Sequence, residues 1–236
     1  MKDKQTFIEH LEELRLRILY SAGVAVIFAI LSFFFNREIL DLIRVPLGRE
    51  LVFIAPHEAF FVTLKVSVFA GIIISMPVTA YHLWKFIGIA LEKNEKKFIL
   101  IYLPATLLLF AIGAIFGFFV VLPLGLGFLL DFGGPGLKPM LSVDKYVGFV
   151  FLMVMVFGIT FQLPLIMRMV TSLGIVEKTA LRSGRRYAVV GIFLAAAIMT
   201  PPDVFTQVAL ALPVLMLYEI GLMVSSGKRP RNTIKG

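Results

Sequence analysis

Stretches of 15 to 26 residues with few or no charges alternate with short charged segments along the whole chain. An α-helix rises 1.5 Å per residue, so about 20 apolar residues cross a hydrocarbon core roughly 30 Å thick. The pattern therefore predicts an all-α integral membrane protein with six transmembrane helices, which we place at 18–35, 59–84, 98–123, 146–170, 187–201 and 204–224. We expect residues 1–236 to form one transmembrane domain.

Proline and glycine set two of these boundaries. The uncharged run from Phe98 to Leu130 has 33 residues, too many for one untilted span, so we expect its helix to end near Pro123 and an external loop to follow over 125–139. Pro201 and Pro202 cannot donate hydrogen bonds inside a lipid-facing helix, which predicts a tight turn over Thr200–Asp203. The last two helices are therefore short, which indicates local bilayer thinning or helices that stop below the membrane surface.

The N-terminal segment, residues 3–17, predicts an amphipathic helix. Phe7, Leu11 and Leu14 share one face, and Glu12 and Glu13 lie opposite. One interpretation is a helix that rests on the bilayer and carries ion pairs such as Glu13 with Arg17. The other is that these carboxylates bind a cation, because acids beside an anionic leaflet are otherwise out of place. The run that follows ends in three phenylalanines and no cleavage site, which predicts a retained anchor rather than a signal peptide.

The distribution of lysine and arginine predicts the orientation in the membrane. Sixteen of the 23 basic residues fall in the N-terminal segment, the second and fourth loops and the C-terminal tail, whereas five fall in the loops on the opposite side. Basic residues accumulate on the cytoplasmic side of membrane proteins. The asymmetry predicts that both termini are cytoplasmic, and it accounts for the net charge of +8 without nucleic acid.

Composition excludes several kinds of chemistry. The chain is 59% hydrophobic and 16% charged, which excludes a soluble globule. It has no cysteine and three scattered histidines, so we expect no disulfide, no metal site and no cofactor. Hydrolase and nucleotide-binding motifs are missing, so we expect no catalytic residues and no enzyme. An ion-coupled small-molecule transporter remains the alternative, although such proteins need carboxylates near the bilayer midplane.

Few polar residues fall inside the predicted crossings. We interpret Lys65 and Glu219 as side chains that snorkel to an interface. Gln162 lies in the fourth crossing, where its amide is either a hydrogen bond between helices or a working polar site. Gly113 and Gly117 have the GxxxG spacing, which is typical of close helix packing.

Several motifs resemble the TatC family, the multi-spanning receptor component of the twin-arginine protein translocase. They are HLEELRLR at His10–Arg17, RVPL at Arg44–Leu47, WKFIGIALEKNEKK at Trp84–Lys97, TPPDVFTQ at Thr200–Gln207 and YEIG at Tyr218–Gly221. The resemblance covers essentially the whole chain. It implies a curved wall of six helices with a concave face, in the cytoplasmic (inner) membrane of a bacterial-type cell.

The resemblance also implies the ligand and the partners. Glu13 and Glu95 match acids that recognise the paired arginines of signal peptides on folded cargo. Arg15 and Arg17 match positions expected to orient those acids, and Phe86 matches a sensitive position beside them. Single-span TatA-type and TatB-type subunits are the implied partners, with the bilayer around them and self-association left open.

The remaining matched positions fall in two groups. The polar positions of the implied docking patch for partner subunits are Gln162, Thr200, Asp203 and Gln207, and the structural prolines are Pro46, Pro201 and Pro202. The chain departs from the family at two places, because it has Gln162 where the family commonly has glutamate and Ile89 where the family has proline. The first departure removes any role that needs a charge in the fourth helix.

Overall fold

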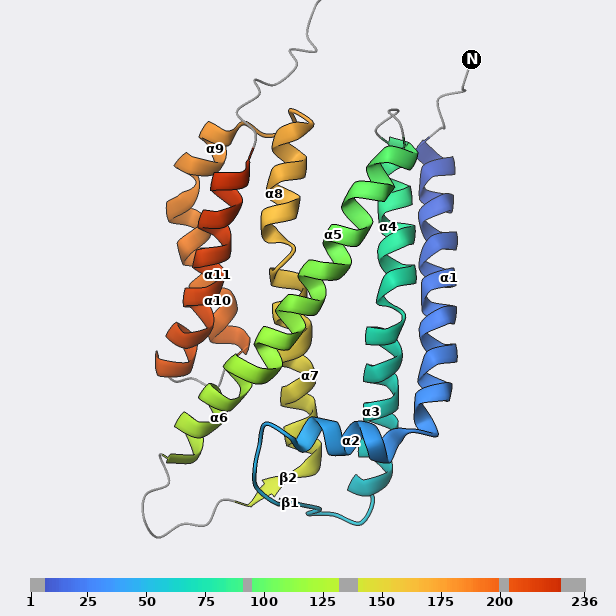
Figure 1. Ribbon diagram of the computed structural model, residues 1–236, viewed down its shortest axis with the longest axis vertical. Coiled ribbons are helices and arrows are strands. Elements are labelled where there is room, and N and C mark those ends of the chain that lie inside the picture. The colour runs from blue at the N-terminus through green and yellow to red at the C-terminus, as the bar shows by residue number, and fades with distance from the viewer. Residues whose placement is uncertain (1–6, 91–94, 132–139, 200–203, 226–236) are drawn as a thin grey trace, which may run out of the picture. The chain divides into compact units, whose positions relative to one another are not determined.

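The computed structural model describes residues 7–90, 95–131, 140–199 and 204–225. Nearly all of them are helical (Figure 1). The elements in chain order are α1 (Phe7–Phe33), α2 (Asn36–Arg44), β1 (Leu51–Val52), α3 (Glu58–Ile74), α4 (Met76–Ala90), α5 (Glu95–Phe116), the π-helical turn η1 (Gly117–Val121), α6 (Leu122–Asp131), β2 (Leu141–Ser142), α7 (Val143–Thr160), α8 (Leu163–Ser172), α9 (Lys178–Ser183), α10 (Arg185–Met199) and α11 (Val204–Val224).

The lengths of the helices fit a membrane protein. Within the described residues, four stretches are long and apolar enough to cross a bilayer, namely Leu11–Phe33, Ile99–Leu130, Val143–Ser172 and Thr206–Val224. A fifth is the pair Glu58–Ile74 and Met76–Gly88, which is bent by 46° at the break between them. The prediction of an all-α membrane protein is confirmed. The sixth crossing, predicted over 187–201, corresponds to α10, which has 15 residues, and the count of six stays a prediction.

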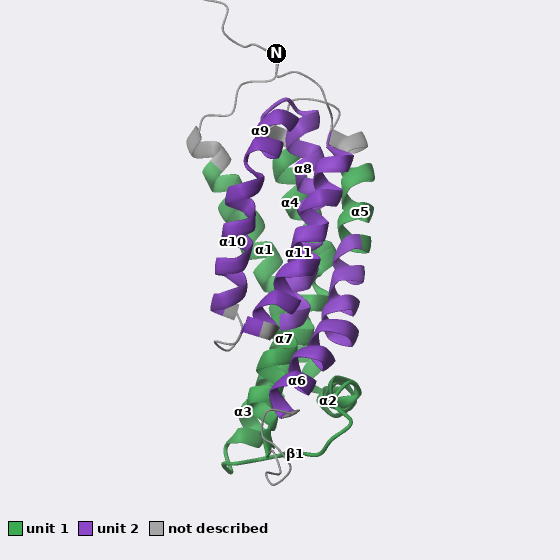
Figure 2. Cartoon of the chain, turned by 90° about the vertical axis from the view of Figure 1, so that its left-hand side faces the viewer, with its two compact units in different colours: residues 1–108, 140–152 green, residues 109–139, 153–236 purple. Residues whose placement is uncertain are grey.

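The chain divides into two compact units (Figure 2). Unit 1 comprises residues 1–108 and 140–152, and unit 2 comprises residues 109–139 and 153–236. In unit 1, α1, α3 and α4 lie side by side (Figure 1). A Cβ atom at Gly71 of α3 would lie 2.5 Å from the backbone nitrogen of Ala29, so any larger residue would push α1 away. Close contact between α1 and α3 therefore depends on this glycine.

The end of unit 1 that carries β1 and α2 joins two segments far apart in sequence. β1 and β2 pair in parallel, with Leu51 opposite Leu141 and Val52 opposite Ser142. The hydroxyl of Tyr146 donates to the carbonyl of Ile43, with 2.7 Å between the oxygens, and so fixes α2 to α7. The first and third loops are thereby held together at this end.

Unit 2 is built on close contacts at glycine. A Cβ atom at Gly113 would lie 2.4 Å from the carbonyl oxygen of Phe157, and one at Gly117 would lie 2.7 Å from that of Met153. The close helix packing predicted from the GxxxG spacing is thus confirmed. On the other side of the unit, α11 packs against α8 and α10.

Two sequence-based expectations need correction. The helix expected to end near Pro123 continues to Asp131, because the π-helical turn at Gly117–Val121 precedes the proline and α6 begins at Leu122. Proline is tolerated in the first turn of a helix, where its missing N–H has no intrahelical partner. The N-terminal amphipathic segment is also not a separate surface helix, since α1 runs without a break from Phe7 to Phe33. The turn predicted at Thr200–Asp203 lies outside the described residues.

Candidate functional site

A half-buried ion pair lies near the start of α1. Glu13 and Arg17 are four residues apart, and both the Nε and a terminal nitrogen of Arg17 donate to the same oxygen, Oε1, of Glu13. The Nε–Oε1 distance is 3.1 Å. The side chains keep 22% (Glu13) and 11% (Arg17) of their surface exposed, so the pair is partly shielded from solvent. The ion pair predicted from the i,i+4 spacing is confirmed.

The second oxygen of Glu13, Oε2, accepts no hydrogen bond from Arg17. Oε2 is buried and has no hydrogen-bond partner among the residues that the structure describes. A buried acceptor without a donor costs free energy, so this oxygen favours any ligand that brings an N–H group. The arrangement therefore has capacity for a cationic donor.

The two neighbouring charged residues of α1 differ from this pair. Glu12 and Arg15 are exposed. Arg15 forms no ion pair with any other residue in the described part of the chain. Of the two arginines expected to orient the acids, Arg17 contacts Glu13 and Arg15 does not.

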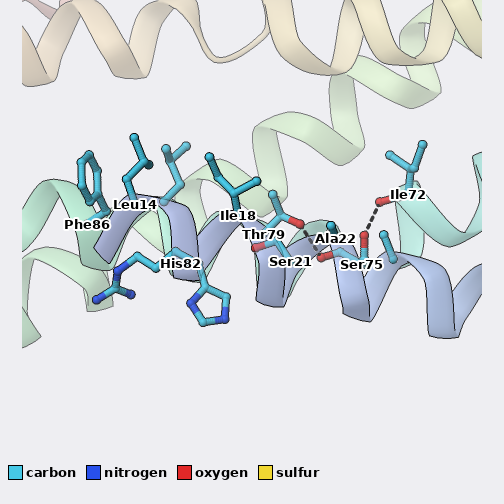
Figure 3. A pocket seen from close by; sticks show the side chains of 12 residues that line it. Leu14, Ile18, Ser21, Ala22, Ile72, Ser75, Thr79, His82 and Phe86 are labelled. Carbon is cyan, nitrogen blue, oxygen red and sulfur yellow. Dashed lines mark hydrogen bonds between the residues drawn. The ribbon is translucent and has the colours of Figure 1, made fainter. Parts of the chain in front are cut away.

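A groove of about 320 Å³ adjoins the pair on the surface of unit 1 (Figure 3). Arg17 is one of its lining residues, and Phe86, expected from the resemblance to lie near the site, is another. The groove runs between α1 and α4, and it is lined by Leu14, Arg17, Ile18, Ser21, Ala22, Ala25, Ile72, Ser75, Thr79, His82, Leu83 and Phe86. Phe86 and Arg17 thus line the same groove.

For Glu95, the second predicted acid, only the backbone is described. Glu95 is the first residue of α5, but its side chain lies outside the described residues, as does the whole of Glu92. Thr200, Pro201, Pro202 and Asp203 also lie outside them. Pro46 lies in the turn that follows α2 and is half-buried, where the N–H of Leu47 donates to the carbonyl of Arg44 at 3.0 Å.

The two glutamines of unit 2 take part in helix contacts. Gln162 is buried at the break between α7 and α8, and its Nε2 donates to the carbonyl of Gly158 at 3.3 Å. Gln207 of α11 donates through Nε2 to the carbonyl of Phe193 in α10 at 3.0 Å. Each amide therefore stabilises a local helix arrangement.

Sequence reasoning missed a polar cluster at the end of unit 1 where β1 and β2 pair. Both oxygens of Glu58 accept hydrogen bonds, Oε1 from the Ser142 hydroxyl and the Asp144 N–H and Oε2 from the Ile54 N–H. Glu58 is the first residue of α3 and precedes the predicted crossing. These bonds, that from Ser142 above all, lower the pKa of Glu58 to about 2.

The two residues interpreted as snorkelling are both paired in the structure, and snorkelling itself stays a prediction. Lys65 forms an ion pair with Asp144, and Glu219 accepts from Arg185 Nε at 2.6 Å. In both cases the partner belongs to another helix, so spacing along the chain does not reveal it. A serine and an acid just before an apolar run, as at Ser142 and Asp144, are the signal that would have suggested a helix start with capping side chains.

No group of His, Asp and Glu side chains within the described ranges could hold a metal ion. The polar chemistry found there consists of carboxylates, guanidinium groups, hydroxyls and amides. Such groups can bind and orient a ligand, and the Glu13–Arg17 pair adjoins the groove.

Comparison with known proteins gives a consistent result. Residues 9–213 match the family model of the Sec-independent protein translocase protein (TatC). Among curated TatC proteins, that of Aquifex aeolicus is 39% identical over 92% of each chain, and that of Escherichia coli K12 is 38% identical over 95% of this chain and 90% of the relative. The relative from Desulforapulum autotrophicum is 36% identical over 94% of this chain and 84% of its own.

Solved structures agree. A crystal structure of the twin-arginine translocase receptor TatC in the detergent DDM superposes with a TM-score of 0.84 at 38% identity, covering 93% of this chain and all of the other. A second TatC structure gives a TM-score of 0.81 at 37% identity. These relatives do not support the alternative of an ion-coupled transporter. The chain belongs to the TatC family and is a subunit of the twin-arginine translocase.

Proposed function

We propose that this subunit is the receptor for twin-arginine signal peptides of folded cargo, and that Glu13 and Glu95 bind the two arginines from the cytoplasmic side. The observation that carries the proposal is the half-used carboxylate of Glu13, with Oε1 held by Arg17 and Oε2 enclosed without a partner among the described residues. A guanidinium group arriving at Oε2 supplies the missing donor.

The chemistry favours arginine over lysine. A guanidinium is planar and presents several N–H donors in a fixed geometry that matches a carboxylate, whereas an ammonium is a point charge. A carboxylate has about four acceptor positions, so Glu13 can keep its bonds to Arg17 and still accept from a ligand. A signal with two arginines therefore gains affinity that one with two lysines does not.

The test is quantitative binding of a signal peptide to the detergent-solubilised protein. A charge-assisted hydrogen bond is worth about 1.5 to 3 kcal/mol, so Glu13→Ala and Glu95→Ala should each weaken binding roughly ten- to a hundredfold. Glu12→Ala and Glu92→Ala are the matched controls and should have little effect, and a twin-lysine peptide should bind poorly to every variant. Equal affinities across the four alanine variants would exclude the assignment.

The chain is a multi-pass membrane protein, and we infer further that it lies in the cytoplasmic membrane with six crossings and both termini in the cytoplasm. The distribution of basic residues supports this orientation. Because the chain has no cysteine, single cysteines can report it. Those at positions 2, 94, 180 and 233 should react with an impermeant thiol reagent only from the cytoplasm, and those at 48 and 136 only from outside. Labelling of position 180 from outside would contradict the placement of the fourth crossing.

We also propose that single-span TatA-type and TatB-type subunits dock on the polar positions Gln162, Thr200, Asp203 and Gln207, and that the chain itself catalyses no reaction. Gln162 is the sharpest test because it stands where the family commonly has glutamate. Replacement by leucine should reduce cross-linking to a partner subunit, whereas glutamate should be tolerated. If the leucine variant cross-links and transports as well as the parent, the amide only stabilises the break between α7 and α8.

A further inference from the structure

The end of unit 2 that carries α9 is rich in cationic side chains. α8 ends there, α9 and the start of α10 follow, and α11 ends beside them (Figure 1). Within nine residues of sequence lie Lys178, Arg182, Arg185 and Arg186. No aspartate or glutamate occurs between residues 178 and 202. These positive charges are therefore balanced either by α11 or by a ligand.

Two of the four cations hold α11. The Nζ of Lys178 donates to the carbonyl of Ser225 at 3.1 Å, just beyond the end of α11. The Nε of Arg185 lies 2.6 Å from Oε1 of Glu219. These contacts fix α9 and the start of α10 to the last part of α11, so Lys178 and Arg185 are already occupied.

The other two cations, Arg182 and Arg186, have no anion beside them. Both are exposed, and neither forms an ion pair with any residue that the structure describes. Gly184, the one residue between α9 and α10, keeps a right-handed helical backbone, and residues four apart in such a backbone face the same side. A terminal nitrogen of Arg186 donates to the Tyr187 hydroxyl at 3.1 Å, and its guanidinium lies 4.8 Å from the ring centroid. The aromatic ring thus restrains one of the two guanidinium groups.

An exposed apolar face of α10 continues from these arginines. Its members follow each other at i, i+3, i+7 and i+11, are 58% to 86% exposed, and are Tyr187, Val190, Leu194 and Ile198. The opposite side of α10 carries Arg185, which pairs with α11, and the buried Ala196. The exposed face is about 17 Å long at 1.5 Å per residue. A pair of unpartnered guanidinium groups therefore lies at one end of an apolar strip.

We propose that Arg182, Arg186 and the exposed face of α10 bind an anionic phospholipid. Its phosphate accepts hydrogen bonds from the two guanidinium groups, which match phosphate oxygens in a planar geometry. One acyl chain lies along the apolar strip, whose length is close to the roughly 15 Å of one leaflet of a 30 Å hydrocarbon core. Tyrosine at the level of the headgroup is typical of a membrane interface, and basic clusters at the ends of membrane helices attract anionic lipids.

This site is distinct from the proposed receptor function. It lies within unit 2 and uses neither Glu13 nor Glu95. A soluble anion such as inorganic phosphate would use the arginines but leave the apolar strip uncovered. A lipid satisfies both the charge and the strip, which is why the observations favour a lipid.

The first test is a titration of the delipidated, detergent-solubilised protein with phosphatidylglycerol, followed by native mass spectrometry. Replacing Arg182 and Arg186 together by glutamine should weaken the binding of phosphatidylglycerol roughly ten- to thirtyfold and bring it close to that of phosphatidylcholine. The control replaces Arg37 and Arg49 together by glutamine. Both are exposed and form no ion pair with a described residue, so this control removes the same charge elsewhere and should change the affinity by less than about twofold.

A second test locates the lipid on α10. Val190→Cys introduces one thiol into the cysteine-free chain, and Ile115→Cys in α5 is the matched control because Ile115 has the same exposed fraction, 58%. Each thiol carries a fluorophore, and the protein is reconstituted in phosphatidylcholine vesicles that contain either brominated phosphatidylglycerol or brominated phosphatidylcholine. At position 190 the anionic lipid should quench more strongly than phosphatidylcholine, and this preference should disappear when Arg182 and Arg186 are both glutamine. At position 115 the two lipids should quench equally.

Three outcomes would overturn the proposal. Equal losses of affinity in the two double variants would show a general effect of net charge. Displacement of phosphatidylglycerol by inorganic phosphate at equal concentration would show a site for free phosphate. Equal quenching by both lipids at position 190, together with loss of cross-linking to a single-span subunit in the α9 double variant, would show a protein-docking surface. Signal-peptide binding is measured independently with Glu13→Ala, so the failure of either proposal leaves the other standing.

Discussion

Two carboxylates of unit 1 show how the same functional group serves different purposes. Glu58, at the start of α3, accepts hydrogen bonds on both oxygens, from Ser142, Asp144 and the backbone before α3. Glu13, near the start of α1, accepts from Arg17 on one oxygen and keeps the other without a partner in the described structure. A carboxylate that accepts hydrogen bonds on both oxygens stabilises the fold. A carboxylate with one oxygen that accepts none can still accept a hydrogen bond from a ligand.

The surroundings of Glu58 and Glu13 also differ. Glu58 is 8% exposed, and its donors come from two loops that it holds together. The Glu13 side chain is 22% exposed and adjoins a groove, and its one partner lies a single helical turn away. Loss of Glu58 should therefore affect stability first, and loss of Glu13 should affect binding first. The following predictions test this division from the largest expected effect to the smallest.

Glu58→Ala should lower the melting temperature most. The substitution leaves the buried Ser142 hydroxyl and the partly buried N–H groups of Ile54 and Asp144 without their acceptor. Lost acceptors of this kind lower the melting temperature of a chain this size on the order of 5 to 10 °C. Thermal unfolding of the detergent-solubilised protein measures it. Glu50→Ala, at an exposed position of the same loop, should change the temperature by less than about 1 °C. Equal shifts in melting temperature for Glu58→Ala and Glu50→Ala would show that the hydrogen bonds of Glu58 add no stability.

The pH dependence should reveal the same carboxylate. The pKa of Glu58 is lowered from 4.5 to about 2 in the folded protein, so its contribution to stability is complete above pH 4.5 and is lost as the pH falls towards 2. The difference in melting temperature between the parent and Glu58→Gln should stay constant from pH 7 to pH 5 and shrink below about pH 4.5. A difference that is the same at pH 3 and pH 7 would contradict the lowered pKa.

The part of this picture that sequence reveals is the part with local causes. Apolar runs of membrane length predicted the helical class, and the spacing of Glu13 and Arg17 predicted their ion pair, because a helix brings residues four apart together. Gly113 and Gly117 also predicted a close helix contact from local spacing. Two small residues four apart lie on one face of a helix and let a neighbouring backbone approach.

What the sequence could not show depends on distant partners or on small changes of helix geometry. The Ser142 hydroxyl that donates to Glu58 and the acid that pairs with Lys65 are some 80 residues away, so a lone charge in an apolar run suggests snorkelling when its partner is unknown. The helix continues past Pro123 because a π-helical turn occupies Gly117–Val121. α6 therefore begins at Leu122, and Pro123 falls in its first turn. The run from Phe98 to Leu130 is uncharged throughout, so its pattern does not reveal such a turn.

The ion pair of Lys65 and Asp144 should contribute less than the Glu58 cluster. It is a single ion pair between side chains that are 30% and 35% exposed, whereas Glu58 accepts from three separate donors. A double-mutant cycle with Lys65→Met and Asp144→Asn should give a coupling free energy of about 0.5 to 1 kcal/mol in reversible unfolding. If the effects of the two substitutions on the free energy of unfolding are additive, the ion pair contributes no measurable stability.

The smallest effect should separate the two arginines of α1. Arg17 donates twice to Glu13, through Nε and a terminal nitrogen, and lysine would keep the charge but lose this planar geometry. Losing one net hydrogen bond of about 1 kcal/mol from the group that positions Glu13 should weaken binding of a twin-arginine peptide by about three- to fivefold in Arg17→Lys. Arg15 is exposed and forms no ion pair with another described residue, so Arg15→Lys should change the affinity by less than about twofold. Because both substitutions conserve charge, a difference between them reports on orientation rather than on the local potential. If Arg15→Lys is as harmful as Arg17→Lys, or if neither changes the affinity, the contact between Arg17 and Glu13 does not prepare the carboxylate for its ligand, and the contrast with Glu58 loses its basis.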